Sequence, residues 1–222
     1  MRQFDIILFG ATSFVGEILT KYMLSQQPLG GDVTWAIAGR SQTKLNQLKL
    51  SLGDAAEALP VIVADTCNQA SIDAMCGSTK VIVSTVGPYA LYGEPVIQSC
   101  VASGTDYCDL TGEPQWIHKM LERYQAAAKK SGARIVNCCG FDSIPSDLGV
   151  YFLQQKSNQT HRQHCNSVKM RVKAMKGGAS GGTIASMLNA IKEAMQDKRI
   201  RKIIASPYAL CPTGHGLSLI HI

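Results

Sequence analysis

The sequence predicts an α/β fold built on a doubly wound parallel sheet with helices on both faces. Three observations predict this fold. Short apolar runs typical of buried strands alternate with helical periodicity through the first 150 residues. A glycine turn joins the first run to the first helix, an arrangement that presents backbone N–H groups to a phosphate. The chain has 222 residues, of which 45% are hydrophobic, enough to bury a substantial core.

The elements follow from this alternation in order along the chain. The first strand is predicted over residues 4–9, because the run FDIILF offers almost no polar face. The helix after it has apolar residues at Val15 and then at positions i+3, i+4 and i+7. Further strands are predicted at residues 33–39, 59–65, 80–87, 105–112 and 133–140, and helices at 41–52, 68–78, 94–104 and 114–132. Six strands separated by helices predict one doubly wound sheet.

The pattern changes near residue 150. We therefore expect a nucleotide-binding domain over residues 1–150 and part of a second domain over residues 151–222. The second part contains polar residues without periodicity (151–166), an alternation typical of an exposed strand (167–175), a glycine-rich turn (176–183) and a helix (184–195). These elements cannot close a layer, and the apolar residues of the final GLSLIHI have no predicted partner. We expect the truncated start of an α+β substrate or oligomerisation domain, through which a homodimer can form.

Composition argues against several classes of function. The net charge of +6 is dispersed apart from KRIRK at 198–202, so we expect no nucleic-acid partner. Eight cysteines without a C-x-x-C pair or a secretion signal indicate a reducing compartment and a cytoplasmic protein. No apolar stretch is long enough to span a bilayer; residues 197–204 suit either a solvated basic helix or peripheral contact with a membrane. The HRQHC motif at 161–165 lacks further paired ligands, so we expect a polar linker and no metal.

The glycine turn spans residues 10–16 and has the pattern G-x-x-S-x-x-G. Its position directly after the first strand of an α/β pattern favours a dinucleotide site. Ser13 replaces the middle glycine that is more common, and its hydroxyl can cap the helix and donate to a phosphate. Taken alone, Gly16 is also explained by a structural role, in which it lets the helix pack closely on the sheet. The predicted phosphate-binding residues are Gly10, Thr12, Ser13, Phe14, Val15 and Gly16.

The end of the second strand indicates which dinucleotide is bound. An NAD site normally has an acidic residue there, whereas arginine suits the 2′-phosphate of NADP. Here Arg40 and Ser41 follow the strand and Lys44 lies one turn further, so we predict NADP(H) as the cofactor. Asp65, after the third strand, can contact the adenine amine or begin a turn. The loop after the fourth strand is expected to pass the nicotinamide half of the cofactor, through Val86, Gly87 and Pro88.

Four longer segments resemble a known family. AGRSQTKL (38–45), VGPYALYGEPVIQSC (86–100), DYCDLTGEPQW (106–116) and GFDSIPSDLGV (140–150) are similar to the saccharopine dehydrogenase-like oxidoreductases, which include trans-acting enoyl reductases. SGGTIASM (180–187) adds a weaker match. The resemblance implies a Rossmann domain, an inserted α+β domain and a nicotinamide cofactor. It also implies reduction by NADPH of an enoyl or carbonyl group on a small-molecule or lipid-like substrate. The alternatives are a true saccharopine-type amino-acid dehydrogenase and a catalytically silent NADP-binding sensor or scaffold.

Candidate catalytic residues gather at the ends of the fourth, fifth and sixth strands. Tyr89 and Tyr92 can each protonate the substrate, or pack against the cofactor or the second domain. Asp109 lies beside the expected site, and Glu113 also suits the N-cap of the helix at 114–132. After the sixth strand, two residues can orient the nicotinamide amide or the substrate, or cap a helix: Asp142 and Ser143. None of the tyrosines has Lys four positions later, which argues against a short-chain dehydrogenase.

Overall fold

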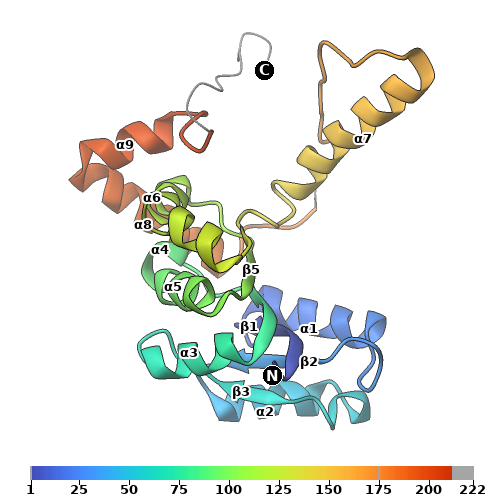
Figure 1. Ribbon diagram of the computed structural model, residues 1–222, viewed down its shortest axis with the longest axis vertical. Coiled ribbons are helices and arrows are strands. Elements are labelled where there is room, and N and C mark those ends of the chain that lie inside the picture. Colours follow the sequence, from blue (N-terminus) through green and yellow to red (C-terminus); the bar gives the residue numbers. More distant parts are fainter. Residues whose placement is uncertain (1, 175, 212–222) are drawn as a thin grey trace.

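A six-stranded sheet forms the centre of the computed structural model, which describes residues 2–174 and 176–211 (Figure 1). All neighbouring strands are parallel, and their order is β3-β2-β1-β4-β5-β6, that of a doubly wound Rossmann sheet. The strands are β1 (Phe4–Phe9), β2 (Trp35–Gly39), β3 (Val61–Val63), β4 (Thr79–Ser84), β5 (Asp106–Asp109) and β6 (Ile135–Val136). The predicted Rossmann-type α/β fold is confirmed.

Helices cover both faces of this sheet. They are α1 (Phe14–Gln26), α2 (Gln42–Ser51), α3 (Gln69–Gly77), α4 (Tyr89–Tyr92), α5 (Glu94–Ser103) and α6 (Pro114–Ser131), with a 3₁₀ turn η1 (Asp54–Ala56). In β1, Ile7 belongs to the hydrophobic cluster that includes residues of α3, α5 and α6. The adjacent Leu8 belongs to the cluster that includes residues of β2 and α2. Successive residues of the strand thus face opposite, buried sides, which explains the continuous apolar run.

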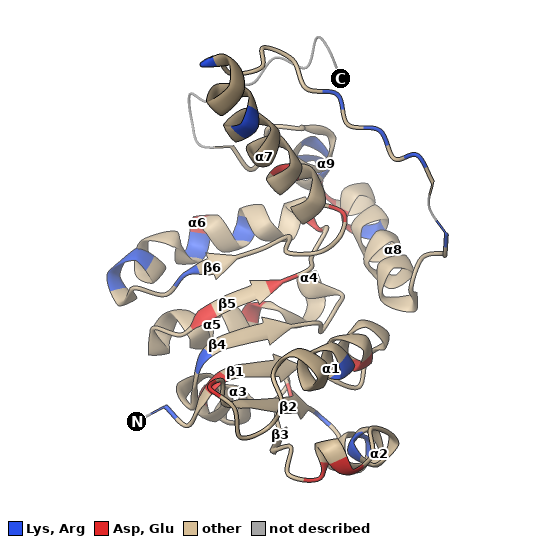
Figure 2. Cartoon of the chain, turned by 90° about the vertical axis from the view of Figure 1, so that its right-hand side faces the viewer, with Lys and Arg blue, Asp and Glu red and all other residues tan. Residues whose placement is uncertain are grey.

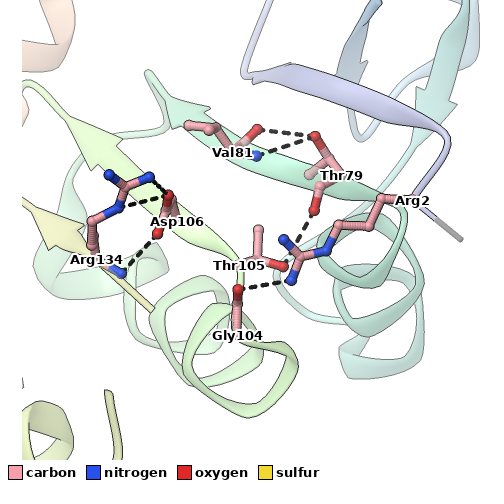
Figure 3. Close-up of polar contacts among 7 residues, drawn as sticks. All are labelled: Arg2, Thr79, Val81, Gly104, Thr105, Asp106 and Arg134. Atoms are coloured by element: carbon pink, nitrogen blue, oxygen red, sulfur yellow. Dashed lines mark hydrogen bonds and ion pairs between the residues drawn. The ribbon is translucent and has the colours of Figure 1, made fainter. Parts of the chain in front are cut away.

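Polar contacts fasten the amino ends of the strands (Figure 3). The Arg2 guanidinium donates to the carbonyl oxygens of Ser103, at 3.0 Å, and Gly104, at 2.7 Å. The backbone N–H of Arg134 donates to Asp106 Oδ1 at 2.9 Å, and its guanidinium forms an ion pair with the same carboxylate. These contacts lie at the edge opposite the glycine turn, so the carboxyl edge is left for binding.

Three helices follow the sheet: α7 (Ile144–His161), α8 (Gly181–Gln196) and α9 (Lys198–Ala205). Figure 1 shows α7 projecting away from the sheet, while α8 and α9 lie beside α6. The predicted loss of periodicity over 151–166 conceals a helix as far as His161, because residues 154–161 are all polar and this half of α7 has no apolar stripe. The predicted domain boundary at residue 150 falls within α7, and the assignment of a second domain stays a prediction.

The strand predicted over residues 167–175 is wrong for the residues that can be described. Residues 167–174 have no regular secondary structure, although Lys169 to Lys173 alternate in sequence as a strand would. A strand needs a neighbouring strand to pair its N–H and C=O groups, and the described residues provide none beside this segment. The GLSLIHI segment, 216–222, lies outside the described residues. Within the described ranges, no helix is both long and apolar enough to cross a bilayer.

Candidate functional site

The glycine turn joins β1 to α1 at the carboxyl edge of the sheet. Gly10 has a φ of +90°, and a Cβ there would lie 2.7 Å from Thr85 Oγ1. A Cβ on Gly16 would lie 2.2 Å from the carbonyl oxygen of Gly10. Both positions therefore require glycine, which brings the first turn of α1 against the end of β1.

Hydrogen bonds define which donors the turn can offer to an anion. The Ser13 hydroxyl accepts from the backbone N–H of Gly16 at 3.0 Å, so the predicted cap is present. Thr85 Oγ1 donates to the Gly10 carbonyl at 2.9 Å, and Ser13 Oγ lies 3.0 Å from Thr85 Oγ1. The single Thr85 proton is thus used, which leaves Ser13 to donate to Thr85 and not to a phosphate. Within the described residues, the N–H groups of Phe14 and Val15 have no acceptor and point from the helix N-terminus.

A first cavity of about 580 Å³ extends from this turn across the ends of β2 and β3. It brings together most of the predicted cofactor residues: Gly10, Thr12, Ser13, Arg40, Ser41, Lys44, Asp65, Val86, Gly87 and Pro88. Arg40 and Lys44 are exposed, and neither side chain forms an ion pair or hydrogen bond with a described residue. Ser41 Oγ accepts from the Lys44 N–H at 3.4 Å as the cap of α2, which leaves the hydroxyl proton free to donate. Two cations and a hydroxyl around a cavity fit a phosphate.

Asp65 begins a turn, as one of its two predicted roles requires. Its Oδ1 accepts from the Cys67 N–H at 2.9 Å. The same side chain lines the first cavity, so the role in adenine binding also stays open.

A second cavity of about 700 Å³ lies on the other side of the α1 N-terminus. It shares Ser13, Thr85 and Gly87 with the first cavity. Its other walls come from α1, α4, the β5–α6 loop, the start of α6, the loop before α7, α8 and α9, and include the predicted Phe14, Val15 and Tyr89. Its lining includes the apolar side chains of Phe14, Val15, Leu110, Met187, Ala190 and Ile204. The two cavities meet at the glycine turn, so a dinucleotide has room for one half in each.

Tyr89 lines the second cavity, but most of its side chain belongs to the core. The side chain is 4% exposed, and its ring packs against Trp116 with centroids 5.6 Å apart. Its hydroxyl donates to the Ser84 carbonyl at 3.0 Å. Burial, followed by the nearby Asp109 carboxylate, raises the pKa of Tyr89 well above its ordinary value. These contacts give Tyr89 a structural environment. Tyr92 lines the first cavity, and its hydroxyl has no hydrogen-bond partner among the described residues.

Asp109 is 2% exposed and connects β5 to the loop after β6. Its Oδ2 accepts from Tyr107 Oη at 2.9 Å and from Asn137 Nδ2 at 2.8 Å. Its Oδ1 accepts from the backbone N–H groups of Thr111 and Cys138, each at 3.1 Å. Burial raises the pKa of this carboxyl, although the four hydrogen bonds favour the charged form. Asp109 lines neither cavity, so the structure does not bring it together with the other predicted residues.

Glu113 occupies the N-cap position of α6, but its side chain makes no capping bond there. Its carboxylate reaches the start of α4 instead, where it accepts from the N–H groups of Tyr89 at 2.8 Å and Ala90 at 2.9 Å. Ser186, from α8, donates its hydroxyl to Glu113 Oε1 at 2.8 Å. Both side chains line the second cavity. Sequence reasoning did not single out Ser186, and its place within SGGTIASM was the one available signal.

Asp142 and Ser143 are adjacent in sequence but occupy different environments in the structure. Asp142 lines the second cavity and is exposed. Ser143 takes the N-cap position of α7, but its hydroxyl makes no capping bond. Among the described residues, no group of three His, Cys, Asp or Glu side chains is placed to hold a metal.

Comparisons with known proteins agree with this geometry. The family model described as the saccharopine dehydrogenase NADP-binding domain matches residues 6–136. A Mycobacterium tuberculosis H37Rv protein, provisionally named a trans-acting enoyl reductase, is 42% identical over 95% of this chain and 50% of its own length. The trans-acting enoyl reductase of Mycobacterium bovis BCG Pasteur is 37% identical over 94% of this chain and 50% of its own length. The chain therefore spans about half the length of the curated relatives it matches.

Solved structures align with this chain at low identity. Saccharopine dehydrogenase (L-Glu forming) from Saccharomyces cerevisiae aligns with a TM-score of 0.48 at 18% identity, over 72% of this chain and 32% of that one. Triphenylmethane reductase from Citrobacter, complexed with NADP(H), aligns with a TM-score of 0.46 at 13% identity, over 69% of this chain and 56% of that one. The match of the family model over most of the sheet is the decisive finding: the chain belongs to the saccharopine dehydrogenase NADP-binding domain family.

Proposed function

We propose that this chain binds NADPH across the two cavities and supplies the cofactor half of a reductase that acts on an enoyl or carbonyl group of a lipid-like substrate. The observation that carries the proposal is the cluster of Arg40, Ser41 and Lys44 at the end of β2. Arg40 and Lys44 have no acidic partner among the described residues, and a 2′-phosphate supplies one. NADPH, when bound, supplies a hydride to the substrate.

The chain's own residues have separate tasks in this proposal. The N–H groups of Phe14 and Val15 hold the pyrophosphate at the α1 N-terminus. Arg40 and Lys44 fix the adenosine end, and Gly87 lets the other half of the cofactor pass close to the sheet. Tyr92 lines the first cavity together with Gly87, which also lines the second, and it stays a candidate proton donor because its hydroxyl has no partner among the described residues. Tyr89 and Asp109 take structural roles, since their polar atoms are already hydrogen-bonded.

The lining of the second cavity supports the substrate class. Among the described residues, this lining contains several apolar side chains and no Lys or Arg. A saccharopine-like substrate carries several carboxylates, which need cationic partners when they leave water. A lipid-like substrate needs apolar contacts. The cavity therefore favours reduction of a lipid-like substrate over a true saccharopine dehydrogenase. The names of the mycobacterial relatives support the same choice.

Titration of NADPH and NADH into Arg40→Ala tests the cofactor assignment. A charge-assisted contact contributes about 1.5–3 kcal/mol, so NADPH affinity should fall by about tenfold to a hundredfold. NADH lacks the 2′-phosphate and should bind as before. Lys44→Ala should show the same preference more weakly, because salt screens an exposed ammonium. Lys49→Ala, on the same helix but outside the first cavity, is the matched control. Equal losses for both cofactors, or tighter binding of NADH by the wild type, would contradict the proposal.

Turnover requires a second assay. NADPH oxidation in the presence of a panel of enoyl thioesters and carbonyl compounds should be followed for this chain and for a form extended to the length of its relatives. Cofactor binding without turnover in both forms would favour the silent sensor or scaffold. Light scattering and sedimentation with vesicles test the predicted homodimer and membrane contact.

A further inference from the structure

We propose that Ser186 and Glu113 form a subsite for a primary amide, in which Ser186 Oγ accepts a hydrogen bond from the carboxamide N–H of the nicotinamide. The inference rests on the proposed function, because it takes the bound group to be NADP(H). It concerns the nicotinamide end of the cofactor, whereas the cluster of Arg40, Ser41 and Lys44 concerns the 2′-phosphate end.

The position of Ser186 is the first support. Ser186 extends from α8 toward the loop after β4, and a Cβ built on Gly87 would lie 3.9 Å from Ser186 Oγ. Gly87 lines both cavities, and Ser186 lines the second. With the adenosine end at Arg40 and the pyrophosphate at the α1 N-terminus, the second cavity would hold the nicotinamide half. Gly87 and Ser186 would then both line the site of its carboxamide.

The polarity of the Ser186 hydroxyl is the second support. Two backbone N–H groups, those of Tyr89 and Ala90, donate to the Glu113 carboxylate at 2.8 and 2.9 Å. These donors mark Glu113 as the acceptor, so the Ser186 proton points to Glu113 Oε1 at 2.8 Å. A hydroxyl has one proton and two lone pairs. Ser186 can therefore offer the second cavity acceptor capacity only, and its ligand there must be an N–H or O–H donor.

Burial keeps this polarity fixed. Glu113 is 3% exposed, so water cannot readily replace Ser186 as its third donor. A carboxamide carries two N–H donors and suits such an acceptor. Asp142 also lines the second cavity and is the competing acceptor for the same amide. It is exposed, and no described hydrogen bond fixes its orientation.

The test compares NADP⁺ with its 3-acetylpyridine analogue, in which a methyl group replaces the amide NH₂. Calorimetric titration of the whole chain gives the ratio of the two dissociation constants. One hydrogen bond to a neutral group corresponds to about a two- to tenfold preference, so the wild type should bind NADP⁺ more tightly by that factor. Ser186→Ala should bind both ligands with equal affinity. Relative to the wild type, its affinity for NADP⁺ should fall, and its affinity for the analogue should not change. Ser180→Ala removes another hydroxyl from the same cavity. This hydroxyl caps α8 by accepting from the Thr183 N–H, so the variant should lose some stability but keep the wild-type ratio.

Three outcomes would overturn the inference. In the first, Ser186→Ala weakens both ligands equally, which would indicate a purely structural role. In the second, Asp142→Ala abolishes the preference while Ser186→Ala keeps it. In the third, the wild type shows no preference, a result that decides the matter even if Ser186→Ala fails to fold. Failure of the wild type to bind either ligand would contradict the proposed function as well, whereas NADP⁺ binding without a preference contradicts this inference alone.

Discussion

Single residues in this fold acquire their roles from the hydrogen bonds around them. Tyr89 and Asp109 have the chemistry of acid catalysts and follow strands at the carboxyl edge of the sheet, which made both reasonable predictions. The groups that fix them lie far away in sequence: the Glu113 carboxylate and the Trp116 ring for Tyr89, and Asn137 and Cys138 for Asp109. No local pattern reveals such partners. The Rossmann sheet itself follows from local periodicity, so the sequence predicts the edge where the site lies better than it predicts the state of each side chain.

Tyr89→Phe tests this distinction at the residue scale. The variant removes the hydrogen bond to the Ser84 carbonyl and should lower the free energy of unfolding by about 1 kcal/mol. NADPH affinity and any turnover should change little, whereas loss of a general acid costs about a hundredfold to ten-thousandfold in rate. Urea denaturation and cofactor titration measure both effects. Tyr92→Phe is the control for stability, because its hydroxyl has no described partner. Unchanged stability in Tyr89→Phe, with a large loss of rate, would restore Tyr89 as the acid.

At the scale of elements, α1 depends on close approach to the strand before it. Gly16→Ala places a methyl group against the Gly10 carbonyl and should displace the α1 N-terminus, with a large loss of NADPH affinity and of stability. Gly77→Ala, at the end of α3, meets no atom within 4 Å and should be neutral or stabilising by up to about 1 kcal/mol. Thermal melts and cofactor titrations of the two variants give the comparison. Equal melting temperatures and equal NADPH affinities of the two variants would show that the close contact between Gly16 and the Gly10 carbonyl is not required.

The Asp106–Arg134 contact between the start of β5 and the residue before β6 should make the stability of the fold depend on pH in the acid range. Hydrogen bonding to Arg134 lowers the pKa of Asp106 below its ordinary value of 3.8. A lowered folded-state pKa stabilises the fold fully above the ordinary value, and this contribution disappears as the pH falls below 3.8 toward the lowered value. Asp106→Asn should therefore lose less stability than the wild type between pH 7 and pH 3, measured as urea midpoints. Parallel acid curves for the two proteins would show that other carboxyls control the transition.

Element boundaries were predicted well where packing is local and poorly where it is absent. Helix α5 ends at Ser103, one residue before the predicted end, and Gly104 caps it with a φ of +65°. The second half of helix α7 was not predicted, because residues 154–161 are all polar and none of them is buried against another described element, which would require an apolar stripe. The alternation of residues 167–175 indicated a strand, but strand formation depends on a pairing partner that this segment itself cannot specify.

Across the whole molecule, charge divides at the predicted boundary. Residues 1–150 carry 11 Lys and Arg against 14 Asp and Glu, a net charge of −3, whereas residues 151–222 carry 11 against 2, a net charge of +9. Figure 2 shows Lys and Arg, without Asp or Glu, along the extended segment between α7 and α8. Residues 166–174 and 176–179 make no hydrogen bond within the described part of the chain.

This segment should be the first site of tryptic cleavage. Proteases need an extended backbone without hydrogen bonds, and the segment offers Lys169, Arg171, Lys173 and Lys176 in that state. Lys129 and Lys130 are equally exposed, but they lie within α6 and should resist as internal controls. Mass spectrometry of a brief digest should find a fragment that begins at residue 1 and ends between residues 169 and 176, with the whole sheet intact.

This fragment should keep the discrimination between NADPH and NADH, because Arg40, Ser41 and Lys44 remain. It should lose the preference for the amide over its acetyl analogue if α8 dissociates, because Ser186 leaves with it. First cleavage within residues 1–150 would contradict the division of the chain at this point.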